Sequence, residues 1–131
     1  MPSIASKGLN ILVVDDERAV TASVSFVLKK SGHAVDAVHD GEDALVKLRE
    51  SPNHYQILIT DHFMRKVSGL ALVEQVHKKE FQGRIVVLSG YLKPELEKSY
   101  RALGVDRIIR KPFDLTELRE TIEELKLLLE K

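Results

Sequence analysis

The sequence predicts an α/β protein in which a parallel sheet is covered by helices on both faces. Five short apolar runs alternate along the chain with five segments whose apolar residues recur at helical spacing. Three of the runs are rich in Ile and Val at successive positions, which is typical of central strands buried on both sides. A length of 131 residues suits one domain built from such units.

The five apolar runs are the expected strands. They lie at residues 11–14, 34–38, 57–59, 85–88 and 108–109. Parallel strands need crossover connections, which are right-handed, so a helix is expected between each strand and the next. For a chain of this kind we expect a flavodoxin-like, doubly wound five-stranded sheet with strand order 2-1-3-4-5.

Each helical segment has an apolar stripe and a stop signal. The stripes are Val20/Val24/Val27/Leu28, Ala44/Leu45/Leu48, Leu72/Val73/Val76, Leu96/Tyr100/Leu103 and Leu118/Ile122/Leu125/Leu129. The first four segments end at or before Gly, Pro or Asn residues, at 31–32, 51–53, 83 and 104. The fifth is expected to start at Asp114, with Glu117 completing a capping box.

Composition excludes several classes of function. Lys and Arg together number 20, as do Asp and Glu, so no net charge favours nucleic acid or an anionic membrane as a partner. The absence of Cys excludes disulfides, thiolate metal sites and cysteine nucleophiles. Apolar runs of at most four residues and a polar N-terminal segment predict a cytoplasmic protein without a membrane span or signal peptide.

Polar residues follow four of the five expected strands. Asp15-Asp16 ends the first, Asp61 the third, Ser89 the fourth and Lys111 the fifth. Because ligands bind outside the carboxyl ends of strands in an open α/β sheet, we expect these side chains to share one pocket. Each alone is an ordinary helix cap or loop residue, but their combination is hard to explain that way.

The chemistry of this set favours a phosphoryl group. Three carboxylates repel one another, and a hard divalent cation such as Mg²⁺ relieves that repulsion. Lys111 and Ser89 add a positive charge and a hydroxyl donor, which suit the charged oxygens of a phosphoryl group. One carboxylate can act as the nucleophile and form an aspartyl phosphate.

Five short motifs stand in order along the chain. They are Val13-Val14-Asp15-Asp16-Glu17, Ile57-Leu58-Ile59-Thr60-Asp61, Met64 and Gly69 three and eight residues after Asp61, Val87-Leu88-Ser89-Gly90 and Lys111-Pro112-Phe113. In this order and spacing, the chain resembles the receiver domains of two-component response regulators, the chemotaxis regulators among them. The resemblance runs from about residue 10 to residue 128, so the expected domains are a tail at 1–9, a receiver at 10–128 and a helix end at 129–131.

The resemblance implies a role for each site residue. Asp61 would accept a phosphoryl group from a sensor histidine kinase or a histidine phosphotransfer protein. Mg²⁺ would be held by Asp16, Asp61 and the backbone carbonyl of Phe63, and by Asp15 mainly through water. Ser89 and Lys111 would bind phosphoryl oxygens, and the bond from Lys111 to Pro112 is often cis in this family.

Two positions depart from the family pattern. Arg65 stands where Pro is usual, and Ile108 stands where Tyr or Phe usually turns inward on activation. We therefore expect signalling to depend on Ser89, the loop after it and the fourth helix. The resemblance implies that Phe63 and Tyr91 flank the phosphoryl group, where their bulk is expected to slow its hydrolysis. The alternative is that the Tyr91 hydroxyl orients the attacking water or that both rings turn outward to solvent.

The predicted function is a phosphorylation-dependent signalling switch that acts on no diffusible metabolite and catalyses only its own phosphorylation and dephosphorylation. Its expected partners are the kinase or phosphotransfer protein and a downstream effector or output domain. The alternatives are a Mg²⁺-dependent aspartyl-phosphate phosphatase or phosphotransferase, and a degenerate receiver that acts only as a binding module.

Two further features lie outside the predicted pocket. Leu127-Leu128-Leu129 is more apolar than an exposed helix end needs. It would serve as a homodimer seam, a docking patch, the start of a helix into an output domain, or a partly buried frayed end. The five histidines show no helical metal-ligand spacing and are predicted to be surface or loop residues; they are His33, His39, His54, His62 and His77.

Overall fold

The computed structural model describes residues 8–130, which form alternating strands and helices. The strands are β1 (Asn10–Val14), β2 (Ala34–Val38), β3 (Ile57–Asp61), β4 (Arg84–Ser89) and β5 (Arg107–Arg110). The helices are α1 (Arg18–Lys30), α2 (Gly41–Glu50), α3 (Gly69–Lys78), α4 (Pro94–Ala102) and α5 (Leu115–Leu129). The predicted alternation is confirmed, and each boundary lies within a few residues of the expected one.

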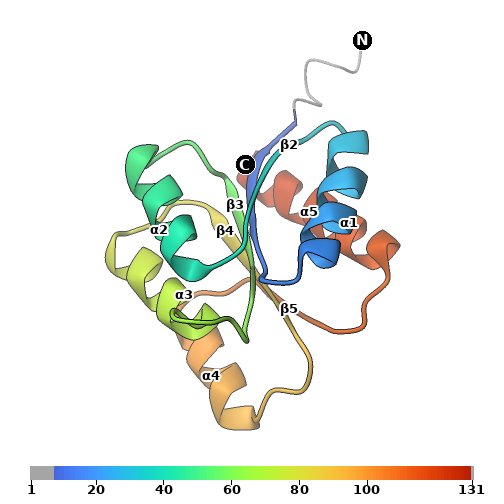
Figure 1. Cartoon of the computed structure of the whole chain (residues 1–131). Coiled ribbons are helices and arrows are strands. Elements are labelled where there is room, and N and C mark those ends of the chain that lie inside the picture. Colours follow the sequence, from blue (N-terminus) through green and yellow to red (C-terminus); the bar gives the residue numbers. More distant parts are fainter. Residues whose placement is uncertain (1–7, 131) are drawn as a thin grey trace.

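The five strands form a single parallel sheet in the order β2-β1-β3-β4-β5, as the sequence predicts (Figure 1). Helices α1 and α5 cover one face, and α2, α3 and α4 cover the other. β1 and β3 are neighbours in register, with Val13 opposite Ile59 and Val14 opposite Thr60. The acidic residues that end these two strands are thereby brought to the same edge of the sheet.

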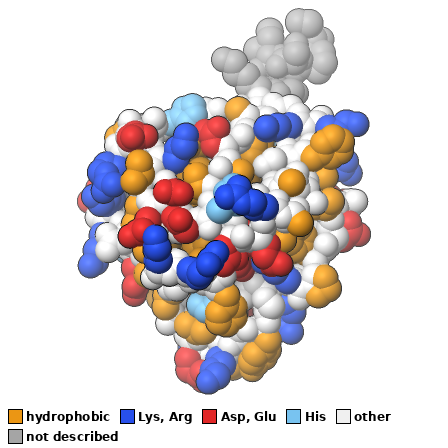
Figure 2. Space-filling model, viewed as in Figure 1, with side chains coloured by type: hydrophobic (Ala, Val, Ile, Leu, Met, Phe, Trp, Pro, Cys, Tyr) orange, Lys and Arg blue, Asp and Glu red, His pale blue; other side chains and the backbone are white. Residues whose placement is uncertain are grey.

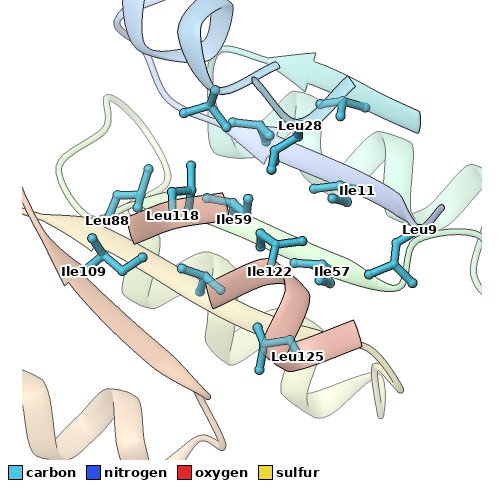
Figure 3. Packing of buried hydrophobic residues seen from close by; sticks show 14 residues of the cluster. Leu9, Ile11, Leu28, Ile57, Ile59, Leu88, Ile109, Leu118, Ile122 and Leu125 are labelled. Carbon is cyan, nitrogen blue, oxygen red and sulfur yellow. The ribbon is translucent and has the colours of Figure 1, made fainter. Parts of the chain in front are cut away.

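Alternating side chains of the central strands supply two hydrophobic cores. Ile11 and Val13 of β1 face α1 and α5, whereas Leu12 and Val14 face α2, α3 and α4. Figure 3 shows the first core, in which Ile122 of α5 packs over the sheet. Burying each such side chain stabilises the fold by about 1.5–3 kcal/mol, so the carboxyl ends of the strands are held on a rigid base.

The ends of the chain differ in detail from the sequence expectation. Leu9, placed at the end of the tail, is 4% exposed and belongs to the first core. The Asp114 carboxylate caps α5 by accepting a hydrogen bond from the amide of Thr116, not from that of Glu117. Residues 1–7 of the expected tail and residue 131 lie outside the described residues.

Gly69 fixes the path of the loop between β3 and α3. A Cβ atom at this position would lie 2.4 Å from the backbone oxygen of Asp61 and 2.9 Å from the hydroxyl of Tyr100. The amide of Gly69 donates to the carbonyl of His62, which closes the loop. Only glycine permits this approach, so the start of α3 is held against the acceptor strand.

No helix within residues 8–130 has both the length and the apolar character needed to cross a bilayer.

Candidate functional site

Three carboxylates converge at the carboxyl ends of β1 and β3. Asp15 and Asp16 follow β1 directly, and Asp61 is the last residue of β3. One carboxylate oxygen from each lies within 4.8 Å of the others. Asp15 and Asp61 are buried and Asp16 is half-buried, so the cluster opens to solvent on one side. The predicted convergence is confirmed.

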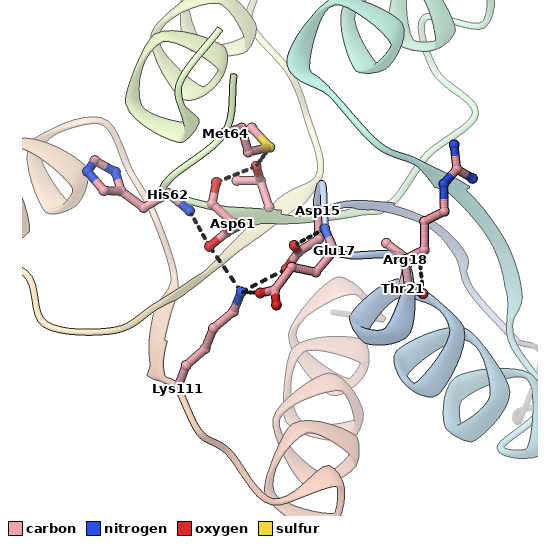
Figure 4. Close-up of polar contacts among 9 residues, drawn as sticks. Asp15, Glu17, Arg18, Thr21, Asp61, His62, Met64 and Lys111 are labelled. Atoms are coloured by element: carbon pink, nitrogen blue, oxygen red, sulfur yellow. Dashed lines mark hydrogen bonds and ion pairs between the residues drawn. The ribbon is translucent and has the colours of Figure 1, made fainter. Parts of the chain in front are cut away.

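Lys111 lies between the carboxylates of Asp15 and Asp61, as Figure 4 shows. Its ammonium nitrogen is 2.9 Å from Asp15 Oδ2, 3.2 Å from Asp61 Oδ1 and 3.5 Å from Glu17 Oε1. The amide of Lys111 donates to the carbonyl of Ser89, which ties the end of β5 to the end of β4. The peptide bond between Lys111 and Pro112 is cis.

The remaining contacts of the two buried carboxylates come from backbone amides. Asp15 Oδ1 accepts a hydrogen bond from the Glu17 amide at 2.9 Å. Asp61 Oδ1 accepts one from the His62 amide, also at 2.9 Å. These bonds orient each carboxylate toward the shared centre, where its charge is available to a ligand.

The site carries more negative charge than its protein partners balance. Burial raises the pKa of Asp61, and the neighbouring Asp15 carboxylate raises it further. Burial opposes the charged form of Lys111, but the hydrogen bonds and charges of Asp15 and Asp61 outweigh burial and raise its pKa. One ammonium among three carboxylates leaves an excess of about two negative charges, which a divalent cation would neutralise.

The donor set fits Mg²⁺. All three side chains offer hard carboxylate oxygens, and the open side leaves room for the water molecules that Mg²⁺ retains. Asp15 already contacts Lys111 and the Glu17 amide, so it is the carboxylate least free to bind a cation directly.

Ser89 ends β4 beside Asp61. Its hydroxyl is fully buried and has no hydrogen-bond partner within residues 8–130. A buried hydroxyl without a partner carries a desolvation cost of about 1–3 kcal/mol. A ligand oxygen in the pocket would remove that cost, and the sequence had pointed to Ser89 as such a donor.

The two flanking residues predicted by resemblance, Phe63 and Tyr91, are both exposed. Phe63 is 68% exposed and Tyr91 is 66% exposed, so both rings extend into solvent. The Tyr91 ring lies 5.7 Å from the Arg110 guanidinium. Arg65 is also exposed, whereas Ile108 is half-buried against the core beneath α4.

All five histidines are exposed or lie in loops, as predicted, but the two loop residues His33 and His62 are buried. His33 Nδ1 accepts a hydrogen bond from the Leu9 amide, and its Nε2 lies 3.0 Å from Glu123 Oε2. Since Nδ1 is the acceptor, the proton of the neutral ring sits on Nε2 and points to the carboxylate. His33 therefore pins β1 to α5, far from the acidic cluster.

His62 is the second buried histidine, and it follows Asp61 directly. Its Nδ1 lies 2.5 Å from the hydroxyl of Tyr100 on α4, and the two rings pack edge to face. Burial lowers the pKa of His62, which favours the neutral imidazole. Proximity to Asp61 along the chain was visible in the sequence, but the partner lies 38 residues away.

The surface around the site has mixed charge. Figure 2 shows acidic and basic side chains interspersed over the viewed face, without a continuous basic surface. Equal numbers of acidic and basic residues agree with this view. A broad electrostatic footprint for nucleic acid is therefore not present on that face.

A family model described as the response regulator receiver domain matches residues 11–123. The chain belongs to this family. It is 32% identical over 109 residues to the gliding motility regulatory protein of Myxococcus xanthus, covering 82% of this chain and 14% of that protein. It is 29% identical over 113 residues to the chemotaxis protein CheY of Treponema pallidum, covering 86% of this chain and 78% of that protein.

Solved receiver structures share the fold. A CheY-like receiver domain protein from Methanospirillum hungatei has a TM-score of 0.89 at 25% identity, covering 95% of this chain and 98% of that chain. The chemotaxis protein CheY4 of Vibrio cholerae has a TM-score of 0.82 at 26% identity, covering 90% and 98%. This receiver is thus a two-component signalling domain of a family whose members are switches rather than classical enzymes.

Several curated relatives are much longer than the matched region. The chain spans 14% of the Myxococcus protein and 48% of the transcriptional regulatory protein DltR of Streptococcus agalactiae. The shared region is the receiver itself, so the similarity bears on this domain and not on the rest of those proteins.

Proposed function

We propose that this receiver is a phosphorylation-dependent switch in which Asp61 accepts a phosphoryl group from a phosphohistidine. The observation that carries the proposal is that the buried Asp61 carboxylate clusters with Asp15 and Asp16 and contacts the Lys111 ammonium at 3.2 Å. The buried Ser89 hydroxyl at the end of the neighbouring strand has no hydrogen-bond partner among residues 8–130. Membership of the receiver family supports a sensor histidine kinase or a histidine phosphotransfer protein as the donor.

In the proposed transfer, a carboxylate oxygen of Asp61 attacks phosphorus in line with the imidazole nitrogen of the donor. The new bond joins this oxygen to phosphorus, the phosphorus–nitrogen bond breaks, and the released imidazole takes a proton from solvent. The Lys111 ammonium lies close to Asp61, so it can exchange its contact with the Asp61 carboxylate for one with an oxygen of the new phosphoryl group. The Ser89 hydroxyl donates to a second phosphoryl oxygen, which gives it the partner it lacks.

Mg²⁺ would be held by Asp16 and Asp61, with Asp15 acting mainly through water and the backbone carbonyl of Phe63 as a further ligand. When bound, Mg²⁺ supplies positive charge that offsets the charge of the phosphoryl oxygens. The three carboxylates supply the negative charge that retains the cation. Lys111 then has two roles, as partner of Asp15 and as ligand of the phosphoryl group.

The same proposal extends to the wider setting of the domain. We assign residues 10–128 to the receiver, residues 1–9 to a tail whose last residue, Leu9, packs into the receiver core, and residues 129–131 to the helix end. We place the domain in the cytoplasm, where its phosphodonors act, and expect a downstream effector or output domain as the receiving partner. The exposed Leu127 and Leu128 at the end of α5 are a candidate homodimer contact.

The test uses acetyl phosphate as a small phosphodonor. The protein is incubated with acetyl phosphate and Mg²⁺, its intact mass is measured and the modified residue is mapped. We expect a single phosphoryl group on Asp61, none in Asp61→Asn, and none when EDTA removes the metal. Asp114→Asn is a matched control, because Asn also caps helices and Asp114 lies outside the cluster.

This labelling assay and a turnover assay with generic phosphate esters together separate the alternatives. Labelling that persists in Asp61→Asn would overturn the acceptor assignment. Turnover of generic phosphate esters would favour a phosphatase or phosphotransferase. A folded protein that never becomes labelled would be a degenerate receiver that acts only by binding.

A further inference from the structure

We infer that the hydrogen bond between His62 and Tyr100 couples the acceptor Asp61 to helix α4, so that both are positioning residues of the switch. This inference rests on the proposed function and identifies the path by which α4 responds to it. The pair joins the residue next to Asp61 with the last turn of the helix whose position would report phosphorylation.

His62 is attached to the acceptor in two ways. It follows Asp61 in the chain, and its amide donates to Asp61 Oδ1 at 2.9 Å while also lying 3.1 Å from the carbonyl oxygen of Leu88. Its imidazole makes the bond to Tyr100 at the same time. A change in the Asp61 carboxylate therefore alters the hydrogen bonding of a residue whose ring contacts α4.

Tyr100 is the anchor of α4. It is fully buried, and it is the one fully buried residue that the structure describes within this nine-residue helix. Its hydroxyl also lies against the start of α3, where a Cβ at Gly69 would be 2.9 Å away. Leu96 and Leu103 pack against the same core but are only partly buried, so Tyr100 is the deepest contact of α4 and its movement displaces the helix.

The pair behaves as a unit because both of its polar groups are buried. His62 is 7% exposed and Tyr100 is 0% exposed. Separating them would leave a ring nitrogen and a hydroxyl without water or another partner, which is costly in a protein interior. Movement of His62 is therefore transmitted to Tyr100 instead of being lost in a broken contact.

This link accounts for a position where the chain departs from its family. Ile108 packs against the same core cluster as Tyr100, but its side chain has no hydrogen-bonding group and no ring to reorient. The His62–Tyr100 pair lies on the same side of the sheet, and it has both hydrogen-bonding groups and aromatic rings. It provides a polar connection from the site to α4 that does not pass through β5.

The test measures how α4 responds when the site is filled. Amide NMR spectra are recorded for wild type and for Tyr100→Phe. Each protein is measured free and with beryllofluoride, which mimics the phosphoryl group, in the presence of Mg²⁺. In wild type we expect shift changes at residues 89–91 and at residues 96–102. In Tyr100→Phe, the changes at 89–91 persist while those at 96–102 fall at least two-fold.

A matched pair of variants at residue 62 tests the partner side. His62→Asn places a polar atom near the position of Nδ1 and should retain most of the α4 response, whereas His62→Leu should lose it. Spectra of the ligand-free variants identify any change in α4 that precedes binding, and the response is scored against each variant's own free state.

The outcomes distinguish the coupling from the proposed function. An α4 response in Tyr100→Phe that keeps more than half of its wild-type size overturns the coupling, as does an equal response in His62→Asn and His62→Leu. If wild type shows no change at residues 89–91, the phosphoryl mimic does not bind, and the proposed function fails together with the coupling that rests on it.

Discussion

The ammonium nitrogen of Lys111 lies 2.9 Å from Oδ2 of Asp15, a carboxylate with no exposure to solvent. The two residues are 96 positions apart and follow the two strands β5 and β1, which are not neighbours in the sheet. Lys111 reaches across the end of β3 and contacts Asp61 on the way. Its charge is therefore shared by the carboxylates that would otherwise only repel one another.

Removing this charge should destabilise the metal-free protein. Lys111→Met keeps the unbranched side chain as far as the ε position but leaves Asp15 buried without its charged partner, which costs about 3 kcal/mol in comparable buried pairs. We expect that loss in the free energy of unfolding by urea in EDTA. Millimolar Mg²⁺ should recover part of it, because a bound cation replaces the missing charge.

Lys66→Met is the control for this prediction. Its ammonium pairs with Glu42 at 3.3 Å, but both side chains are more than half exposed. A pair of this kind contributes less than about 1 kcal/mol. Equal losses in the two variants would show that the contacts of Lys111 with the buried carboxylates contribute nothing special.

Asp16→Asn should have the opposite effect in the absence of metal. It removes one of three clustered negative charges while keeping the shape of the side chain. A gain of about 1 kcal/mol would raise Tm by about 3–5 °C in EDTA. Millimolar Mg²⁺ should raise the Tm of wild type. The rise should be much smaller in Asp16→Asn, because this variant has lost one of the proposed carboxylate ligands of Mg²⁺.

Differential scanning calorimetry of both proteins with EDTA or Mg²⁺ measures all four values. Glu120→Gln, on an exposed part of α5, controls for the loss of one negative charge elsewhere. If Asp16→Asn melts below wild type in EDTA, or gains as much from Mg²⁺ as wild type does, the three carboxylates do not act as one site.

The fold and most of the site could be predicted because both follow from local patterns. Continuous apolar runs identify strands that are buried on both faces of the sheet, and apolar stripes at helical spacing identify the helices. The sheet order then places the ends of β1 and β3 side by side. Asp15, Asp16 and Asp61 then have to converge wherever their own strands end. No knowledge of side-chain packing is needed for that inference.

Packing decides what the sequence could not show. His33 and His62 are buried because each has partners remote in sequence, Glu123 in the first case and Tyr100 in the second. A single histidine in the sequence carries no sign of such a partner. The outward placement of the Phe63 ring was likewise not visible, because an exposed aromatic residue has the same pattern as a buried one.

Alkaline pH should weaken the fold through Tyr55. Its hydroxyl donates to Asp36 Oδ2 at 2.5 Å, and burial together with that carboxylate raises the pKa of Tyr55. In the unfolded chain the tyrosine ionises near pH 10, while the folded protein keeps it protonated. Its contribution is complete below about pH 10 and falls by up to about 1.4 kcal/mol per pH unit above that.

Tyr55→Phe isolates this effect, because Phe keeps the ring and cannot ionise. The difference in unfolding free energy between wild type and variant should be constant from about pH 7 to about pH 9 and should narrow above about pH 10. Urea denaturation at closely spaced pH values measures it. A difference that stays constant through the alkaline range would mean that the tyrosine ionises equally in both states.

The lifetime of the phosphorylated state should depend on Phe63. Hydrolysis needs a water molecule in line behind phosphorus, opposite the Asp61 oxygen. Phe63 stands two residues after Asp61, and its exposed ring packs edge to face against His62 at a centroid distance of 4.6 Å. A phenyl ring cannot hydrogen-bond that water, so wild type should lose its phosphoryl group slowly.

Phe63→Asn supplies an amide that can hold the attacking water in position. We expect dephosphorylation about tenfold faster, which corresponds to about 1.4 kcal/mol in the barrier. Tyr91→Ala should also speed it, by less, since it opens the approach without providing a donor. The rate is measured by intact mass after the phosphodonor has been removed.

Phe63→Leu separates orientation of the water from simple access to the site. Leu is smaller than Phe and is equally unable to hydrogen-bond, so it tests access alone. If Leu and Asn accelerate the loss to the same degree, the ring acts by blocking the approach. If neither variant nor Tyr91→Ala is faster than wild type, the two exposed rings do not control the water at all. A rate that rises only with Asn assigns the slow hydrolysis to the missing hydrogen bond, because that is the one property that Phe and Leu share and Asn does not.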